Sequence, residues 1–331
     1  MAGMKPDTCS VSVAPMLDWT DRHCRYFLRL LTPSARLFTE MITTGALLHG
    51  DRERFLRHDV AEHPLAIQLG GSDPQALAQC AAWAAQAGFD EVNLNVGCPS
   101  DRVQSGRFGA CLMLEPETVA ASVAAMCEAV EIPVTVKCRI GVDEHDSYAI
   151  LHDFTDKLVE VGVARLYVHA RKAWLKGLSP KQNRDVPPLD YERVYRLKRD
   201  FPALEIHVNG GVATEDAVQS HLQQVDGVML GREAYHNPWL LARLEARLSG
   251  SGVSELPTRH AVIARLLPYV EEQLAAGVRL HSITRHITGL FQGCPGARAW
   301  RRTLSEQGHR PGAGVEVIEQ ALEDIFKEPP E

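Results

Sequence analysis

A cysteine stands at the end of a short segment in which amide and apolar side chains alternate. Across residues 93–100 (NLNVGCPS), the period of two puts Asn93 and Asn95 on the same side of a predicted strand. Buried amides are unfavourable unless they are hydrogen-bonded, so this face has a polar purpose. Gly97 permits a turn, Pro99 restricts the backbone, and Cys98 is therefore expected at the carboxyl end of the strand. A buried structural cysteine is the alternative, but these neighbours favour a functional thiol.

Several other predicted strands also end on polar side chains. Together with Asn95, the set is Gln68, Lys137, His169 and Asn209. Lys137 shares one face of its strand with Arg139, and His169 shares one face with Arg171. Each polar residue alone could be a satisfied core group or a charge at the rim. Five strands that end in this way predict an active site at the carboxyl ends of a parallel sheet.

Glycines follow the last two predicted strands. One strand ends in Asn209-Gly210-Gly211 and the next in Gly231-Arg232. Glycines allow backbone N–H groups to approach a phosphate, and an arginine supplies positive charge. Loops after strands seven and eight form the usual phosphate site of a barrel, so the sequence predicts a cofactor that carries a phosphate.

The spacing of the apolar runs predicts eight strands separated by amphipathic helices. The predicted strands are Val11–Leu17, Leu37–Ile42, Leu65–Leu69, Glu91–Val96, Val134–Arg139, Arg165–Arg171, Glu205–Asn209 and Gly227–Gly231. Eight β/α units in about 240 residues are typical of an α/β TIM barrel. A doubly wound sheet is the alternative, but the first strand lacks the glycine-rich turn that a dinucleotide site needs.

The length and composition of the chain are consistent with this fold. The chain has 331 residues, and 45% of them are hydrophobic, which is enough for a barrel and a second domain. We predict a catalytic barrel over residues 1–248 and a smaller all-α domain over 249–331, with a linker at Ser249-Gly250-Ser251-Gly252. The eight cysteines show no CxxC pair or zinc spacing, so we expect no metal site. The first ten residues lack a signal-peptide core, which predicts a cytoplasmic protein.

The combined motifs resemble the tRNA-dihydrouridine synthases, most closely the A-type bacterial subgroup. The matching segments are Ala14-Pro15-Met16, Gln68-Leu69-Gly70-Gly71, residues 93–100, Gly109-Ala110-Cys111-Leu112-Met113, Val136-Lys137-Cys138-Arg139-Ile140-Gly141, His169-Ala170-Arg171, Asn209-Gly210-Gly211 and Gly231-Arg232. The resemblance spans nearly the whole chain. It implies a barrel that binds FMN, NADPH as the reductant, and tRNA as the substrate, with the modified uridine in the D-loop near position 20.

The resemblance also implies a role for each site residue. The expected FMN contacts are Pro15, Met16, Leu17, Gln68, Lys137 and His169, with Asn209, Gly210, Gly211, Gly231 and Arg232 at the phosphate. Asn95 and Arg171 are expected to hydrogen-bond the uracil. A hydride from flavin N5 would reach C6 of the uracil, and Cys98 would donate a proton to C5. A free cysteine is mostly protonated at neutral pH, which suits a general acid.

Two stretches without carboxylates are candidates for tRNA contact, although the formal net charge is −7. The first runs from Arg171 to Arg184 and includes Lys181, and the second runs over residues 274–305 and includes Arg298 and Arg301. Solvated helix faces are the alternative, but two such stretches favour phosphate contacts. Trp300 could stack on a base or lie in the core.

Three other functions are compatible with part of this pattern. A flavin dehydrogenase for a free pyrimidine, like the dihydroorotate enzymes, would share the barrel and the lysine but would not need arginine-rich helices. A flavin-free aldolase would use Lys137 for a Schiff base. An RNA-binding protein without activity would leave the polar strand ends unexplained.

Overall fold

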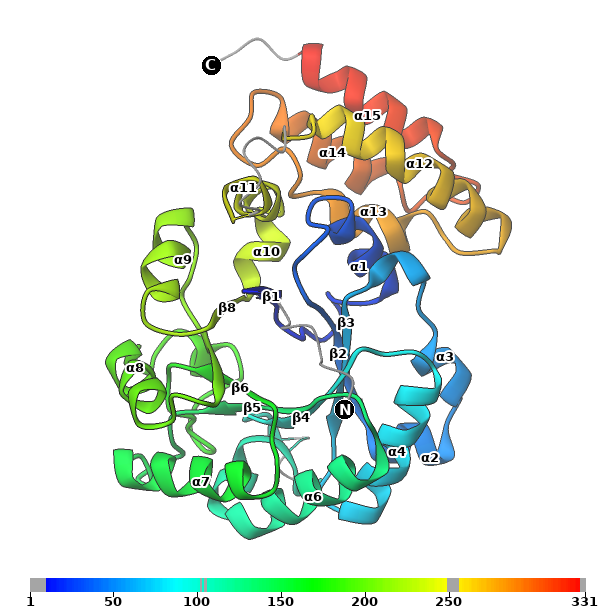
Figure 1. Ribbon diagram of the computed structural model, residues 1–331. Helices are drawn as coiled ribbons and strands as arrows, with labels where there is room; N and C mark the ends of the chain where they lie inside the picture. The colour runs from blue at the N-terminus through cyan, green and yellow to red at the C-terminus, as the bar shows by residue number, and fades with distance from the viewer. Residues whose placement is uncertain (1–9, 102, 104–105, 249–255, 328–331) are drawn as a thin grey trace. The chain divides into compact units, whose positions relative to one another are not determined.

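Eight parallel strands form a barrel at the centre of the larger part of the chain (Figure 1). The computed structural model describes residues 10–101, 103, 106–248 and 256–327. Neighbouring strands follow the order β1-β8-β7-β6-β5-β4-β3-β2. At the seam, Arg36 N donates to Val11 O at 3.0 Å and Val13 N donates to Arg36 O at 2.9 Å. These bonds join the first strand to the residue before the second, so the predicted TIM barrel is confirmed and the doubly wound sheet is excluded.

The elements follow the alternation that the sequence predicts. The strands are β1 (Val11–Val13), β2 (Leu37–Thr43), β3 (Leu65–Gly70), β4 (Glu91–Val96), β5 (Val134–Arg139), β6 (Arg165–His169), β7 (Glu205–Asn209) and β8 (Gly227–Leu230). The barrel helices are α2 (Thr44–His49), α3 (Arg52–Leu56), α4 (Pro74–Gln86), α6 (Pro116–Ala129), α7 (Tyr148–Glu160), α8 (Tyr191–Asp200) and α9 (Glu215–Leu222), with 3-10 turns η1 (Val60–Glu62), η2 (Gly109–Leu114) and η3 (Gln182–Arg184).

Local signals explain where several of these helices begin. Asp73 accepts a hydrogen bond from Ala76 N, and Pro74 occupies the first turn of α4. Ser147 and Thr214 cap α7 and α9 in the same way. These caps satisfy backbone donors that have no partner inside the helix, so the boundaries were readable from the sequence.

Side chains fill the barrel interior. Ala14, Phe38, Ala66, Tyr167 and Met229 form one buried cluster, in which the rings of Phe38 and Tyr167 meet edge to face at 5.1 Å. This arrangement matches the packed core of a barrel and leaves no open channel at this level.

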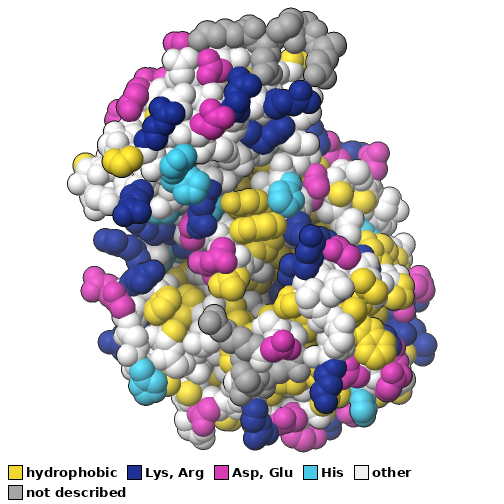
Figure 2. Space-filling view, turned by 180° about the vertical axis from the view of Figure 1, so that it is seen from behind, with side chains coloured by type: hydrophobic (Ala, Val, Ile, Leu, Met, Phe, Trp, Pro, Cys, Tyr) yellow, Lys and Arg dark blue, Asp and Glu magenta, His cyan; other side chains and the backbone are white. Residues whose placement is uncertain are grey.

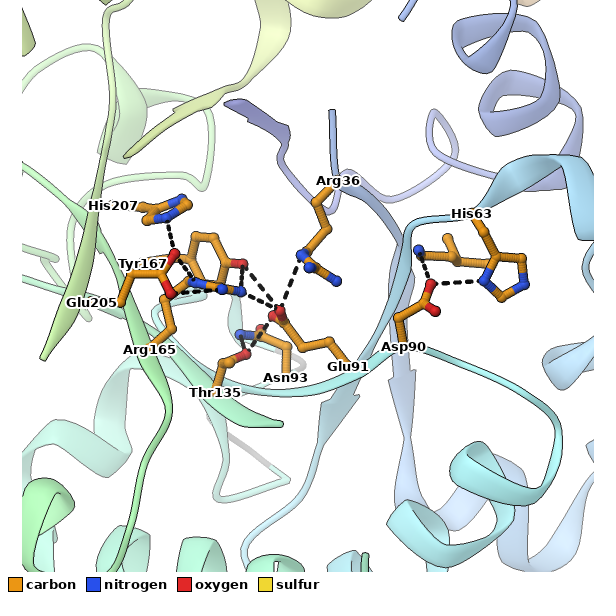
Figure 3. A network of polar contacts seen from close by, with 11 residues as sticks. Arg36, His63, Asp90, Glu91, Asn93, Thr135, Arg165, Tyr167, Glu205 and His207 are labelled. Atoms are coloured by element: carbon orange, nitrogen blue, oxygen red, sulfur yellow. Dashed lines mark hydrogen bonds and ion pairs between the residues drawn. The ribbon is translucent and has the colours of Figure 1, made fainter. Parts of the chain in front are cut away.

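A charged network lies at the opposite end from the polar strand ends, where strands β4, β6 and β7 begin (Figure 3). Arg165 Nη1 donates to Glu91 Oε2 at 2.6 Å, and Arg36 Nε lies 3.2 Å from the same oxygen. Arg165 also pairs with Glu205 at 2.6 Å. Burial of these charges is tolerable because each carboxylate faces a guanidinium group.

The remaining helices form a second compact unit. It contains α1 (Arg22–Arg29), α10 (Arg232–His236), α11 (Trp239–Leu248), α12 (Arg259–Ala275), α13 (His281–Ile287), α14 (Ala297–Gln307) and α15 (Glu316–Lys327). Asp21 caps α1 and pairs with Arg285 at 2.6 Å, and His23 Nδ1 lies 2.7 Å from the Tyr269 hydroxyl. The ring of Tyr26 stacks on Tyr269 at 3.8 Å.

The compact units differ from the division predicted between residues 248 and 249. Residues Asp18–Ala35 and 232–248 group with the C-terminal helices, because α1 contacts α12 and α13 through the side chains named above. The predicted linker, residues 249–252, lies outside the described residues. A single boundary divides a chain into two continuous segments, whereas the helical unit is assembled from two separate segments.

Two predicted strands were too long by more than one residue. Strand β1 stops at Val13, because Pro15 has no backbone N–H for the ladder. Strand β6 stops at His169, and Arg171 N turns back to donate to His169 O at 2.7 Å. Arg171 therefore lies after the strand and not on its inward face.

The surface carries both signs of charge. Figure 2 shows lysine and arginine side chains interspersed with aspartate and glutamate on the face it presents. Among the described helices, none is long and apolar enough to cross a membrane.

Candidate active site

Polar side chains from neighbouring strands meet at the carboxyl ends of the barrel strands, which we call the mouth. In the register of the sheet, Asn95 lies beside Lys137 and His169 lies beside Asn209. Gln68, one strand before Asn95, donates and accepts within the same group of amides. The relative exposure of Gln68, Asn95, His169 and Asn209 does not exceed 9%. The structure thus brings these five predicted residues together.

Lys137 is a half-buried cation that is held by an amide. Its Nζ donates to Asn209 Oδ1 at 3.1 Å, and Asn209 Nδ2 donates to Met229 O at 2.7 Å. Among the described residues, no carboxylate pairs with Lys137. Burial, with a smaller contribution from Arg139, lowers the pKa of Lys137 from 10.5 to about 8. The ammonium group is thus available to an anionic ligand.

Arg139 makes the mouth more electropositive, whereas His169 adds no charge. Arg139 donates from Nε to Gly97 O at 3.1 Å and from Nη1 to Asn183 O at 3.0 Å. Burial lowers the pKa of Arg139 to about 10. Burial, followed by repulsion from Arg139 and Lys137, lowers the pKa of His169 well below 6.5. His169 is therefore a neutral imidazole at pH 7, and the positive charge resides on Lys137 and Arg139.

The backbone after β7 is compatible only with glycine. Gly210 has φ +112° and Gly211 has φ +70°. A Cβ atom on Gly210 would lie 2.6 Å from His169 Cδ2, and one on Gly211 would lie 2.9 Å from the Tyr191 hydroxyl. That hydroxyl donates to Gly210 O at 2.6 Å. The turn therefore carries no side chains, as a phosphate site made of backbone N–H groups requires.

Cys98 follows β4 in a turn that a side-chain amide holds. Its backbone N–H donates to Asn95 Oδ1 at 3.0 Å, and its carbonyl accepts from Ala110 N at 2.9 Å. The thiol is partly exposed, and its Sγ lies 3.6 Å from Ser100 Oγ. Asn95 is thus already engaged with the cysteine turn, in addition to any contact with a substrate.

The segment from residue 171 to residue 187 carries the first basic stretch. Arg171 donates to the carbonyls of Asp185 and Pro187, so its guanidinium is directed into its own loop. Lys181 and Arg184 are exposed at η3. The organising residue is Asn183, which is fully buried, accepts from Trp174 N at 2.7 Å and donates to Trp174 O at 2.9 Å. Sequence inspection missed Asn183, because a single asparagine in a loop carries no periodic signal.

The other predicted residues lie elsewhere in the chain. Arg298 is exposed and Arg301 is half-buried on α14, while Arg232 begins α10; all three belong to the helical unit. Trp300 is fully buried and donates from Nε1 to Ile287 O at 3.1 Å. The alternative prediction, that Trp300 lies in the core, is therefore confirmed. The predicted backbone segment from Pro15 to Leu17 follows β1, and Leu17 is 69% exposed.

Eight parallel strands with a thiol, amides and buried cations at their carboxyl ends define an α/β barrel of the enzyme class. A model of the dihydrouridine synthase family matches residues 12–328, and the chain belongs to this family.

Three relatives show how far the similarity extends. The tRNA-dihydrouridine(20/20a) synthase of Shewanella oneidensis is 60% identical over 314 residues, covering 95% of this chain and 93% of the relative. Proteins with the same name from Vibrio vulnificus and Yersinia pestis are 59% and 60% identical. The alignment with the Vibrio vulnificus protein covers 98% of that protein and 97% of this chain. The alignment with the Yersinia pestis protein covers 90% of that protein and 94% of this chain.

Proposed function

We propose that this protein is a tRNA-dihydrouridine synthase that reduces the C5–C6 double bond of a uridine in the tRNA D-loop, near position 20. FMN is the proposed bound cofactor, NADPH the reductant, and the cytoplasm the location. The names of relatives that align over nearly the whole chain support the substrate. The observation that carries the proposal is the position of Cys98 after β4, beside a buried cationic mouth.

The residues of the mouth fit FMN on two structural grounds. The turn at Gly210 and Gly211 has positive φ angles and carries no side chains, so its backbone N–H groups would be able to approach a phosphate. Lys137 is a half-buried cation whose only described hydrogen-bond partner is the Asn209 amide. FMN, when bound, would supply the hydride that C6 of the uracil receives.

The predicted site residues would then have the following roles. Lys137 would stabilise negative charge on the cofactor ring, and Gln68 would hydrogen-bond its polar edge. The backbone of residues 15–17 would contact the ring. The phosphate would be held by residues 209–211, Gly231 and Arg232. His169, as a neutral imidazole, would hydrogen-bond at the ring without adding charge.

Cys98 would complete the reduction as the general acid. The hydride leaves negative charge on the uracil, and the thiol donates its proton to C5. Asn95 would hold the backbone of the Cys98 turn, and Asn95 and Arg171 would hydrogen-bond the uracil. Proton donation by a positioned group contributes about 10²–10⁴-fold to the rate.

Access to a stacked uridine requires further RNA contacts. Flipping a base out of folded RNA costs a few kcal/mol. Phosphate contacts from Lys181 and Arg184 in the barrel, and from Arg298 and Arg301 in the helical unit, would offset that cost. The requirement for two basic stretches favours tRNA over a free pyrimidine.

The test is incubation of the protein with unmodified tRNA and NADPH, followed by mapping of dihydrouridine by primer extension. We expect a new stop in the D-loop, and Cys98→Ala should bind FMN and oxidise NADPH but lower product formation by about 10²–10⁴-fold. Cys127→Ala is the matched control, because Cys127 is a partly exposed thiol on α6. Normal turnover by Cys98→Ala would refute the role of the acid. NADPH oxidation without tRNA product would refute the substrate.

A further inference from the structure

A continuous series of hydrogen bonds rises from the base of the barrel. At its lower end, Thr135 Oγ1 donates to Glu91 Oε1 at 2.6 Å (Figure 3). Asn93 Nδ2 in turn donates to Thr135 Oγ1 at 2.8 Å. The other carboxylate oxygen of Glu91 faces Arg36 and Arg165, so this end is anchored in the charged network.

The series continues to the backbone of the cysteine. Gln68 Nε2 donates to Asn93 Oδ1 at 2.8 Å, and Asn95 Nδ2 donates to Gln68 Oε1 at 2.8 Å. Asn95 Oδ1 then accepts the backbone N–H groups of Gly97 at 3.2 Å and Cys98 at 3.0 Å. Three side-chain amides and one hydroxyl thus connect a buried carboxylate with the turn that carries the thiol.

Both ends of this series require the same direction. A carboxylate that pairs with guanidinium groups only accepts, so Thr135 must donate to Glu91 and accept from the nitrogen of Asn93. The oxygen of Asn93 then accepts from the nitrogen of Gln68. The oxygen of Gln68 in turn accepts from the nitrogen of Asn95. At the upper end, backbone N–H groups only donate, so they need the oxygen of Asn95. The two independent requirements agree, and no amide can flip without breaking two bonds.

We propose that Glu91 and Thr135 are positioning residues, which fix the direction of the Asn93, Gln68 and Asn95 amides and thereby the backbone of the Cys98 turn. A second consequence concerns the ligand. Gln68 donates one N–H to Asn93 and accepts at Oε1 from Asn95, so the fixed orientation leaves its second N–H as a donor for a ligand. If the proposed function holds, that donor meets a carbonyl oxygen or an unprotonated ring nitrogen of the cofactor.

Hydrogen–deuterium exchange of the peptide that contains Gly97 and Cys98 tests the direction of this series. Thr135→Val keeps the shape of the side chain but removes the hydroxyl, so Asn93 loses its acceptor and Glu91 its donor. Loss of one buried hydrogen bond corresponds to about tenfold, and we expect exchange of these two amides to accelerate by about that factor. Thr135→Ser should restore the wild-type rate.

The matched control is Thr155→Val. Thr155 is as buried as Thr135, but its hydroxyl donates to Leu151 O within α7. Exchange at Gly97 and Cys98 should remain within about twofold of wild type in this variant, although the same chemical group is lost. Unchanged exchange in Thr135→Val, or equal acceleration in Thr155→Val, overturns the proposal. If Thr135→Val does not fold, Thr135→Ala provides the same comparison.

A second measurement addresses Gln68 without tRNA. Gln68→Glu still accepts from Asn95 but loses both N–H donors, the one to Asn93 and the one to a ligand oxygen, so FMN affinity should fall by at least about tenfold. Equal affinity would overturn the donor assignment. Because the exchange experiment needs neither flavin nor RNA, a failure of the proposed function would leave its result intact. Conversely, if the exchange experiment overturned the hydrogen-bond series, the proposed substrate would be unaffected.

Discussion

The half-buried ammonium of Lys137 should destabilise the folded protein in a way that depends on pH. Its pKa falls from an ordinary 10.5 to about 8, because burial removes water and the Asn209 amide replaces it only in part. At about 1.4 kcal/mol for each pH unit, this difference corresponds to about 3 kcal/mol. Natural selection retains such a cost where function needs the charge, as the binding of an anionic cofactor ring would.

The sign follows from proton linkage. Below pH 8 the lysine is charged in both states, and the folded state bears the whole cost. Between about pH 8 and 10.5 the unfolded chain binds more protons than the folded protein, so the free energy of unfolding rises with pH. Relative to Lys137→Met, the wild type should therefore gain about 3 kcal/mol between pH 7 and pH 10.5. Lys137→Met also loses the hydrogen bond to Asn209. This loss shifts the difference in the free energy of unfolding by a nearly constant amount across the pH range.

Urea unfolding of the flavin-free wild type and Lys137→Met, at intervals of pH from 7 to 10.5, measures this difference. Other titrating groups are common to both proteins and cancel. Lys157→Met is the control, because the hydrogen bond to Glu117 raises the pKa of Lys157 and any contribution must fall as pH rises. A Lys137→Met difference that stays flat across this range would refute the burial argument.

Three further outcomes are expected. Gly210→Ala should lower the free energy of unfolding by about 3 kcal/mol, because φ is +112° and the new Cβ meets a ring at 2.6 Å; Gly162→Ala, with φ +86° and open space, should cost only about 1 kcal/mol in the same urea titration. Replacing both Arg298 and Arg301 with Glu should reduce the slope of log tRNA affinity against log salt by about 2 and leave NADPH oxidation intact; an unchanged slope would exclude this phosphate contact. Trp300→Phe should cost about 1 kcal/mol by removing one of the two hydrogen bonds that Ile287 O accepts, with unchanged tRNA affinity, and a selective loss of tRNA binding would contradict its core position.

Much of the barrel was predictable because its signals are local. Strands β4, β5 and β7 have the predicted bounds, since a period of two and flanking glycine or proline residues act over a few positions. The same periodicity placed Asn95 with Asn93, and Lys137 with Arg139, on one face of each strand near its carboxyl end. The motifs spread along the chain were sufficient for the family.

Tertiary structure alone decided the partners of these side chains. Periodicity assigns a face, but it does not say that Asn95 accepts from the Cys98 backbone or that Arg171 turns into its own loop. Such choices depend on the stagger between strands and on loop paths, which bring together residues distant in sequence. The direction of the amide series and the membership of residues 18–35 in the helical unit are long-range properties of this kind. Sequence by itself determined which chemical groups reach the mouth, and only packing across strands decided how each one is oriented.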